Sequence, residues 1–314
     1  MREPIVFLNG AFLPEPETRV PVLTHCLHYG TGVFEGIRAH RDDRTGEMLL
    51  FRAEDHFSRM QHNVKFLNIT LPLQPDELVQ VAAELIRRNE LTTDLYVRPL
   101  AYKSSTKIGV GLPPEDSFMM IALPMGSYLD TEKGLHCGVS SWRRIQDNAI
   151  PCRAKICGAY VNSSLAAQEA RDRGFDEAIF LNETGHVAEG SAMNIFLVRD
   201  GRLITPDVSQ GILEGITRDT VMTLAFDRGI ASVEQRPVDR TELYVADEVF
   251  LCGTAAKIAP VTRIDGRTVG AGSPGPITLR LKDAYDAIVR GALHARPGWV
   301  EPVYGPAGVA SRRV

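Results

Sequence analysis

The chain has few cysteines, few lysines and no long apolar run. Its 314 residues include only five cysteines, at positions 26, 137, 152, 157 and 252. This number excludes a scaffold built on disulfides, and no two cysteines have the C-x-x-C spacing that zinc sites favour. The longest apolar run, residues 118–124, is far too short to span a membrane and predicts a buried strand. The first residues lack the basic and long apolar segments of a signal peptide.

A large excess of one charge is also absent. The chain carries 35 basic and 39 acidic residues, a net charge of −4, so no general attraction to nucleic acid or to an anionic membrane is expected. The 44% of hydrophobic and 24% of charged residues are ordinary for a globular protein. At about 100–200 residues per domain, the length predicts two domains. We therefore expect a two-domain, cytoplasmic enzyme.

The first part of the chain alternates short strands with two helices. An Asn9-Gly10 pair between apolar runs predicts a hairpin. Apolar residues at helical spacing predict a helix over 54–67, and Pro75 predicts the start of a second one. Strands are expected at 33–40, 48–51, 94–101 and 117–123, and Pro99 predicts that the third of these is an edge strand or contains a bulge.

The second part is expected to begin after a linker. Residues 125–135 lack periodicity, so we predict a small N-terminal α/β domain over 1–124, an interdomain loop over 125–135 and a larger C-terminal domain over 136–314. Strands are expected at 136–142, 176–182, 186–189, 193–198 and 247–252, with helices at 161–172, 216–228 and 276–290. The last 20 or so residues are expected to form a loose tail. Clustered hairpins interrupted by helices predict an α+β fold with mixed or antiparallel sheets.

Gly30, Gly32 and Gly36 resemble a dinucleotide-binding loop only superficially. Their spacing misses the G-x-G-x-x-G pattern by one position, and the motif precedes a predicted strand instead of opening a helix. A glycine-rich turn that lets two backbone segments approach closely explains these residues better. The motif therefore gives little support to a nicotinamide-dependent reductase.

An amine nucleophile has few candidates, because only seven of the 35 basic residues are lysines. Lys155 lies among Ile156, Cys157, Gly158 and Ala159, and no acidic residue lies within six positions of it. An amine in a poorly hydrated setting loses its proton more readily and can then form an imine with an aldehyde. Lys257 has similar neighbours, and the flanking residues alone do not separate the two.

Three further features could bind an aromatic, phosphorylated cofactor. Glu189, at a strand end among small residues, is either an ordinary turn residue or a buried carboxylate that faces a heteroaromatic nitrogen. The helix expected to begin near Ile216 offers backbone N–H groups to an anion, although an ordinary capped helix start is the commoner case. Residues 253–256 could form a second such nest after a strand.

Taken together, these segments resemble one family. The chain is similar to the branched-chain amino acid aminotransferases, pyridoxal-phosphate enzymes of fold type IV. The resemblance rests on LHYGTGVFEGIRAH (27–40), FRAEDHFSRM (51–60), YVRPL (96–100), AKICGAYVNSSLAAQEA (154–170), GHVAEGSAMNIF (185–196), GILEGITRD (211–219) and ADEVFLCGTAAKIAPV (246–261). It covers nearly the whole chain except the C-terminal tail. It implies transamination of leucine, isoleucine and valine with 2-oxoglutarate by a ping-pong mechanism, in a homodimer or a larger assembly of dimers.

The resemblance also implies roles for individual residues. Lys155, not Lys257, would bind pyridoxal 5'-phosphate as an imine and carry the proton between the two reacting carbons. The rest of the cofactor site would consist of Arg59, Tyr160, Glu189, Ile216, Thr217 and Thr254. Of these, Tyr160 would bind the phenolic oxygen, Glu189 the pyridine nitrogen and the others the phosphate. The substrate site would consist of Phe34, Gly36, Tyr96, Arg98, Tyr128, Ala255 and a Tyr29 supplied by the partner subunit. No metal is implied.

Other activities remain open at this level. Within the same fold type, a D-amino-acid aminotransferase, an (R)-amine aminotransferase or an aminodeoxychorismate lyase shares the positions of Lys155, Glu189 and Arg59. Arg98 could bind the distal carboxylate of glutamate, or it could form a structural ion pair on an edge strand. The non-enzymatic alternative is a dimeric protein that keeps the fold but binds no cofactor.

Overall fold

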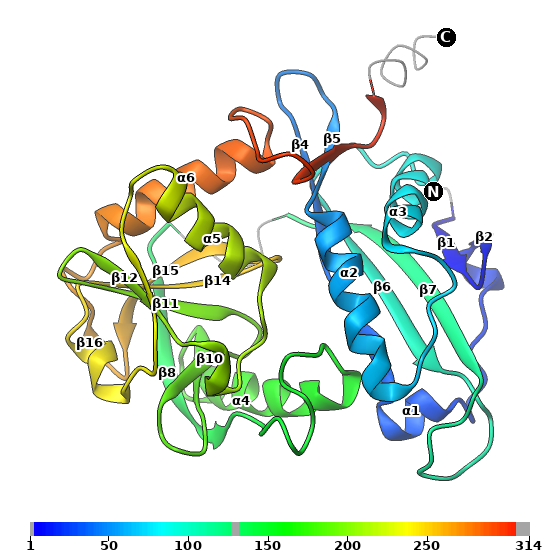
Figure 1. Cartoon of the computed structure of the whole chain (residues 1–314), viewed down its shortest axis with the longest axis horizontal. Helices are drawn as coiled ribbons and strands as arrows, with labels where there is room; N and C mark the ends of the chain where they lie inside the picture. The colour runs from blue at the N-terminus through cyan, green and yellow to red at the C-terminus, as the bar shows by residue number, and fades with distance from the viewer. Residues whose placement is uncertain (1–2, 127–131, 306–314) are drawn as a thin grey trace. The chain divides into compact units, whose positions relative to one another are not determined.

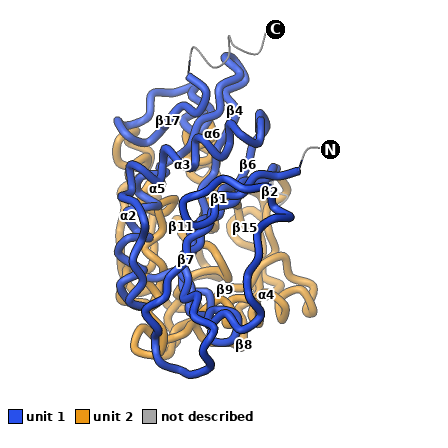
Figure 2. Tube along the Cα trace, turned by 90° about the vertical axis from the view of Figure 1, so that its right-hand side faces the viewer, with its two compact units in different colours: residues 1–126, 154–158, 287–314 blue, residues 127–153, 159–286 orange. Residues whose placement is uncertain are grey.

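Two β-sheets, each with its own helices, form two separate units of the chain (Figure 1). The computed structural model describes residues 3–126 and 132–305. One unit comprises residues 1–126, 154–158 and 287–314, and the other comprises residues 127–153 and 159–286 (Figure 2). The chain therefore returns twice to the first unit, at 154–158 and at 287–314, whereas the sequence predicts one continuous C-terminal domain. The expected loop over 125–135 lies in part outside the described residues, and β8 begins at Leu135.

The first unit contains an antiparallel sheet. Its strands run in the order β17-β5-β4-β6-β7-β1-β2, and β3 pairs with β6 beside β4. The described strands of this sheet pair in antiparallel fashion, as expected for hairpin-rich sequence. The strands are β1 Ile5–Leu8, β2 Ala11–Pro14, β3 Gly32–Phe34, β4 Ile37–Arg41, β5 Met48–Phe51, β6 Leu95–Lys103, β7 Asp116–Pro124 and β17 Val300–Pro302.

The predicted hairpin and helices of this unit are confirmed. Asn9 and Gly10 both have positive φ, and they join β1 to β2. Pro75 opens α3, where Glu77 accepts a hydrogen bond from the backbone N–H of Gln74 at 2.8 Å. The helices are α1 His25–Tyr29, α2 Ala53–Asn63 and α3 Pro75–Arg88, and short 3-10 turns cover Glu15–Glu17 and Val64–Leu67. Each of the two long helices buries the apolar face that its spacing predicts, including Phe57 and Met60 on α2 and Leu78 and Leu85 on α3.

Two expectations for this unit are wrong. β6 is a central strand, with β3 and β4 on one side and β7 on the other. Pro99 is tolerated there because β6 changes partner next to it: Leu100 pairs with β3, whereas Val97 pairs with β4. The last residues are also not wholly a loose tail. β17 pairs with β5, and Trp299 and Val303 are buried, because their apolar side chains complete the core at this edge.

The second unit contains a mixed sheet. Its strands run in the order β10-β9-β8-β15-β14-β11-β12-β13, with β16 beside β15. β8 lies parallel to both β9 and β15, and β12 lies parallel to β13. The strands are β8 Leu135–Arg143, β9 Glu177–Leu181, β10 Val187–Gly190, β11 Asn194–Arg199, β12 Arg202–Thr205, β13 Val233–Gln235, β14 Glu248–Gly253, β15 Lys257–Ile264 and β16 Arg267–Thr268. The helices are α4 Tyr160–Asp172, α5 Ile216–Asp227 and α6 Pro276–Val289, which ends in the first unit, and 3-10 turns lie at Val208–Gln210 and Arg240–Tyr244. A further 3-10 turn, Cys157–Ala159, crosses the boundary between the two units.

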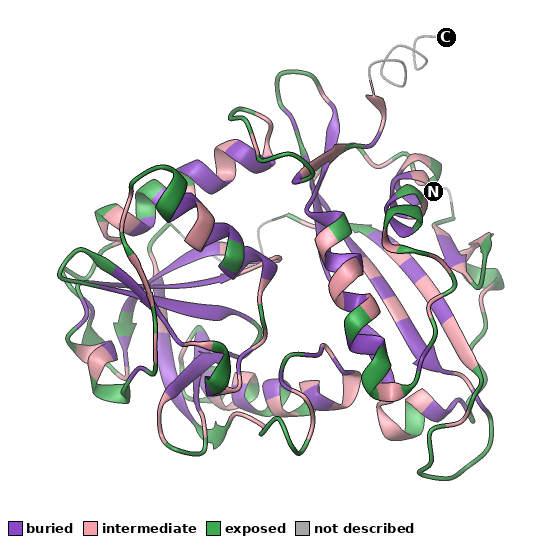
Figure 3. Cartoon of the chain, in the orientation of Figure 1, coloured by how far each residue is buried: buried purple, intermediate pink, exposed green. Residues whose placement is uncertain are grey.

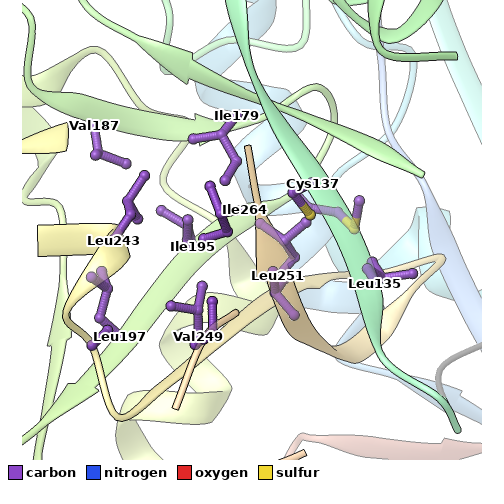
Figure 4. Packing of buried hydrophobic residues seen from close by; sticks show 14 of the residues in the cluster. Leu135, Cys137, Ile179, Val187, Ile195, Leu197, Leu243, Val249, Leu251 and Ile264 are labelled. Carbon is purple, nitrogen blue, oxygen red and sulfur yellow. The ribbon is translucent and has the colours of Figure 1, made fainter. Parts of the chain in front are cut away.

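The strands β9, β11 and β14 of this mixed sheet are buried along nearly their whole length, and Figure 3 shows the buried strands in purple. Along β9, Ile179 and Leu181 join a cluster that also contains Ile195, Leu251 and other residues labelled in Figure 4. Ala178 and Phe180 point to the opposite face, where they pack with alanines of α4. The α+β class with antiparallel and mixed sheets is therefore confirmed. Among the described residues, no helix combines the length and the apolar composition that crossing a membrane requires.

Candidate active site

Lys155 lies in the first unit, on a short segment that is fixed to β3. The backbone N–H of Phe34 donates to the carbonyl of Lys155 at 3.1 Å, and Val33 forms a β-bridge with Ile156. At the end of the segment, the N–H of Gly158 donates to the carbonyl of Gly30 at 3.1 Å. The Lys155 Nζ lies 5.1 Å from the centroid of the Phe34 ring. The amine thus sits against an aromatic face on a backbone held from both sides.

The glycines before β3 allow this close approach. A Cβ on Gly30, whose φ is +67°, would lie only 2.7 Å from the Cα of Gly158. Gly30 follows α1, Gly32 begins β3 and Gly36 lies between β3 and β4, so the motif does not have the strand–loop–helix order that dinucleotide binding needs. The interpretation as a close-packed turn is therefore confirmed.

Gly32 faces the thiols of Cys26 and Cys157, for which the sequence predicts no role. A Cβ on Gly32 would lie 2.9 Å from the Cys26 Sγ and 3.1 Å from the Cys157 Sγ. The hydrogen bond between these thiols raises the pKa of Cys26 and lowers the pKa of Cys157. The thiol pair thus fills the space beside the Lys155 segment, which explains why residue 32 has no side chain.

Arg59 is held by a buried carboxylate that the sequence analysis missed. Its Nε and Nη2 donate to the two oxygens of Glu35 at 2.7 and 2.8 Å. Glu35 also contacts the Nδ1 of His56 at 2.8 Å. Burial by itself would raise the pKa of Glu35, but the charge of Arg59 and the contact with His56 outweigh it and hold this pKa well below its ordinary value. Burial lowers the pKa of His56 in spite of Glu35, so the imidazole is neutral near pH 7.

Glu35 occupies this position because the strand expected over 33–40 is interrupted. β3 ends at Phe34 and β4 begins at Ile37, and between them the N–H of Glu35 donates to the carbonyl of Pro99 at 3.1 Å. Glu35 and Arg59 are 24 positions apart in the chain. The signal for Glu35 was present in the FEGIR block, but only the fold reveals its partner.

Four of the expected substrate residues meet in the first unit. Arg98 donates from Nε and Nη2 to the hydroxyl of Tyr96 at 3.1 and 2.8 Å. Its guanidinium lies 4.4 Å from the centroid of the Phe34 ring. A Cβ on Gly36 would overlap the hydroxyl of Tyr96, so a glycine is required there. Among the described residues no carboxylate pairs with Arg98, and β6 is a central strand, so a structural ion pair on an edge strand is not what Arg98 forms.

Two further aromatic residues are candidates for the substrate site. Tyr29 ends α1, and its hydroxyl accepts a hydrogen bond from the N–H of Gly109 at 3.2 Å. Tyr128 lies outside the described residues.

Glu189 is the centre of a buried polar cluster in the second unit. Its Oε1 contacts Nη2 of Arg144 at 2.9 Å. Its Oε2 accepts hydrogen bonds from the Nδ2 of Asn194 and from the N–H of Leu213, each at 3.0 Å. Three donors favour the carboxylate over the neutral acid. Glu189 is therefore a buried, negatively charged acceptor and not an ordinary turn residue.

Asn194 connects this carboxylate to the start of α5. A Cβ on Gly215 would overlap the Oδ1 of Asn194, so only glycine fits before the helix. Gly215, the residue at the N-cap of α5, has no side chain that could cap the helix, and Ile216 and Thr217 in the first turn are buried. Such a helix start attracts an anion through its N–H groups and its dipole. Neither Asn194 nor Arg144 was predicted, although Asn194 lies within the GHVAEGSAMNIF block.

The remaining candidates also lie in the second unit. Thr254 and Ala255 form the turn between β14 and β15, beside Asn194, because Asn194 pairs with Cys252 across β11 and β14. Tyr160 is the first residue of α4. Lys257, the alternative amine, is engaged by Asp286 at 2.7 Å, so its ammonium has a structural partner.

The chain is similar to proteins of one family throughout. The model of amino-transferase class IV matches residues 32–264. A probable branched-chain-amino-acid aminotransferase of Aquifex aeolicus is 44% identical over 301 residues, which cover 95% of this chain and 96% of the relative. The structure of a branched-chain aminotransferase of Thermoproteus uzoniensis with norvaline has a TM-score of 0.92 and 43% identity, covering 96% of this chain and 100% of that one. The branched-chain amino acid aminotransferase of Thermobaculum terrenum in its PLP form has a TM-score of 0.91 and 40% identity, covering 96% of this chain and 98% of that one.

Proposed function

The chain belongs to the branched-chain amino acid aminotransferase family of the class IV aminotransferases, and we propose that it transfers the amino group of leucine, isoleucine and valine to 2-oxoglutarate with pyridoxal 5'-phosphate. The observation that carries this proposal is the buried carboxylate of Glu189, which three donors hold in its charged form. Such a group is suited to keep a proton on a heteroaromatic nitrogen. The relative from Thermobaculum terrenum was solved in its PLP form.

The residues of both units fit the cofactor chemically. Lys155 supplies the amine, and Arg59, whose orientation Glu35 fixes, supplies a fork for a phosphate. In the proposed site, the N-terminus of α5 and the hydroxyl of Thr254 would offer further donors to a phosphate. Tyr160 would bind the phenolic oxygen and Glu189 the pyridine nitrogen. Each of these roles is part of the proposal.

The reaction then depends on moving one proton. The bound cofactor supplies an electron sink for the bond that breaks at the α-carbon of the substrate. Glu189 keeps the pyridine nitrogen protonated, which strengthens that sink. The Nζ of Lys155 would accept the α-proton and carry it between the two reacting carbons. The aromatic face of Phe34 keeps water away from one side of the amine.

A single pocket would accept both the branched-chain amino acids and glutamate as amino donors. Phe34 and Tyr96 offer apolar faces to a branched side chain, and Arg98, which no carboxylate among the described residues neutralises, offers its charge to the distal carboxylate of glutamate. We further propose a homodimer, in which Tyr29 and Tyr128 complete the substrate site and Tyr29 comes from the partner subunit. The few cysteines and the lack of long apolar runs favour a cytoplasmic enzyme.

The proposal predicts a yellow protein. Borohydride should remove the colour irreversibly and leave the reduced cofactor attached to Lys155. Chiral analysis of the products made from 2-keto acids with glutamate as donor should give L-amino acids. D-products alone would instead support a D-amino-acid or (R)-amine aminotransferase. A protein that stays colourless with added cofactor would refute the enzymatic proposal altogether.

A further inference from the structure

Arg144 is an arginine with a largely covered side chain that the roles given above do not use. It directly follows β8, and its backbone N–H donates to the carbonyl of Leu181 at 2.9 Å. Its Nε donates to the carbonyl of Gly211 at 3.2 Å, and its guanidinium lies 5.9 Å from the centroid of the Phe180 ring. The Nη2 contacts the Oε1 of Glu189 at 2.9 Å. These contacts fix the guanidinium so that one edge faces Glu189.

The pair is nearly removed from water. The side chains of Arg144 and Glu189 are 9% and 7% exposed. A carboxylate in such a place loses most of its hydration, and without an opposite charge it would take up a proton. Hydrogen bonds from Asn194 and Leu213 orient the carboxylate, but they carry no full charge. Arg144 supplies that charge.

Two thiols that interact electrostatically with Glu189 are neutral near pH 7. Burial raises the pKa of Cys252, on β14, to about 12. Burial also raises the pKa of Cys152, whose Sγ donates to the carbonyl of Ile145 at 2.7 Å. Neither thiol therefore adds a negative charge near pH 7 that would compete with the carboxylate for Arg144.

We propose that Arg144 is a positioning residue of this site, which keeps Glu189 charged so that Glu189 can hold the proton on the pyridine nitrogen of the cofactor. Without Arg144, that proton would move to the carboxylate, and a neutral acid would face a neutral nitrogen. The electron sink would weaken although every group that touches the cofactor stays in place. The inference rests on the role proposed for Glu189.

The chain allows Arg144 to be replaced without filling or emptying a packed core. The side chain borders a cavity of about 390 Å³ in the second unit, and polar groups such as Gln146, Asn182 and Gln210 line this cavity. Water can occupy the space that a shorter side chain leaves. Arg144→Gln is therefore the test variant, Arg144→Lys the conservative one, and Arg143→Gln the control, because Arg143 is exposed at the neighbouring position.

The first readout needs no cofactor. In cofactor-free Arg144→Gln the pKa of Glu189 would rise above its unfolded value, so the folded state would hold an extra proton and lose stability as the pH rises. The melting temperature of this variant should fall further below that of the wild type between about pH 5 and pH 8. Adding Glu189→Gln should remove this pH dependence, and Arg143→Gln should not show it. A constant difference across this pH range would overturn the inference.

The second readout is the nitrogen itself. With ¹⁵N-labelled cofactor, the pyridine nitrogen signal should be that of a protonated ring in the wild type and in Arg143→Gln. In Arg144→Gln it should move toward the unprotonated value, while kcat falls about 10- to 100-fold, the range typical of residues that support a ligating group. Arg144→Lys should restore part of both.

The outcomes separate this inference from the proposed function. If Glu189→Gln keeps the wild-type kcat and nitrogen signal, the role of Glu189 itself is refuted. If Glu189→Gln loses activity while Arg144→Gln keeps both the wild-type signal and the wild-type kcat, only the inference about Arg144 is overturned.

Discussion

Each unit of the chain contains an ion pair between an arginine and a buried glutamate, and the two pairs are proposed to act in opposite ways. In the first unit Glu35 is fully buried and holds Arg59, so the arginine is the partner that would meet the ligand. In the second unit Arg144 holds Glu189, and the glutamate would meet the ligand. An anionic phosphate needs a fixed cation, whereas a protonated ring nitrogen needs a fixed anion. The same ion pair can therefore serve either purpose, depending on which partner faces the ligand.

Replacing Lys155 should have the largest effect on kcat, and the effects of replacing residues of the two ion pairs should be smaller. Lys155→Ala should lower kcat by at least about 1000-fold, because the variant loses the group that carries the α-proton. The measurement is the rate of transfer from leucine to 2-oxoglutarate, and Lys257→Ala is the control, since Asp286 engages that ammonium. Substantial activity in Lys155→Ala would mean that another lysine does the chemistry.

The first-unit pair should affect binding more than the chemical step. Arg59→Ala should weaken cofactor binding about 10- to 100-fold, the value of one or two charge-assisted hydrogen bonds. Glu35→Gln should weaken it less, because the guanidinium remains but is held less firmly. Equilibrium titration of cofactor-free protein measures both, with the exposed Arg88→Ala as control. An unchanged cofactor affinity in Arg59→Ala would mean that Arg59 does not bind the phosphate, so the two ion pairs would not have opposite roles.

Arg98 tests whether the pocket serves two kinds of donor. Arg98→Ala should lower kcat/KM for glutamate about 10- to 100-fold and lower it less for leucine, because only glutamate has a distal carboxylate. Equal losses for the two donors would mean that Arg98 supports the pocket as a whole.

The smallest expected effect is on stability in acid. The pKa of Glu35 lies below its ordinary value of 4.5 in the folded state, so its ion pair stabilises the fold fully above about pH 4.5 and loses this effect as the pH falls toward the lowered value. The melting temperature of the wild type should therefore fall more steeply than that of Glu35→Gln between about pH 5 and pH 3. Glu54→Gln, at an exposed position of the helix that carries Arg59, should keep the wild-type slope. Equal slopes for Glu35→Gln and the wild type would contradict the account of this pair.

Local signals in the sequence predicted elements well and partners poorly. The Asn9-Gly10 turn and the helix that begins at Pro75 depend on neighbouring residues, and both are confirmed. The central place of β6 depends on strands far away in the chain, so Pro99 alone was misleading. β17 was missed for the same reason, because it is stabilised by pairing with β5.

The site shows the same division. The resemblance directed attention to Lys155, Arg59 and Glu189, the residues expected to touch the cofactor. Glu35 and Arg144 were missed because nothing near them in the chain indicates that they pair with Arg59 and Glu189. Only the meeting of separate elements reveals such supporting residues, and a single sequence does not contain that information.

The proposed transamination is tested by steady-state kinetics with a panel of amino donors. The assay would pair 2-oxoglutarate with each of L-leucine, L-isoleucine, L-valine and their D-isomers. Parallel lines in double-reciprocal plots of the initial rates would indicate the ping-pong mechanism. We expect turnover with the three L-amino acids and far less with the D-isomers. Turnover confined to D-amino acids or to (R)-amines would contradict the account.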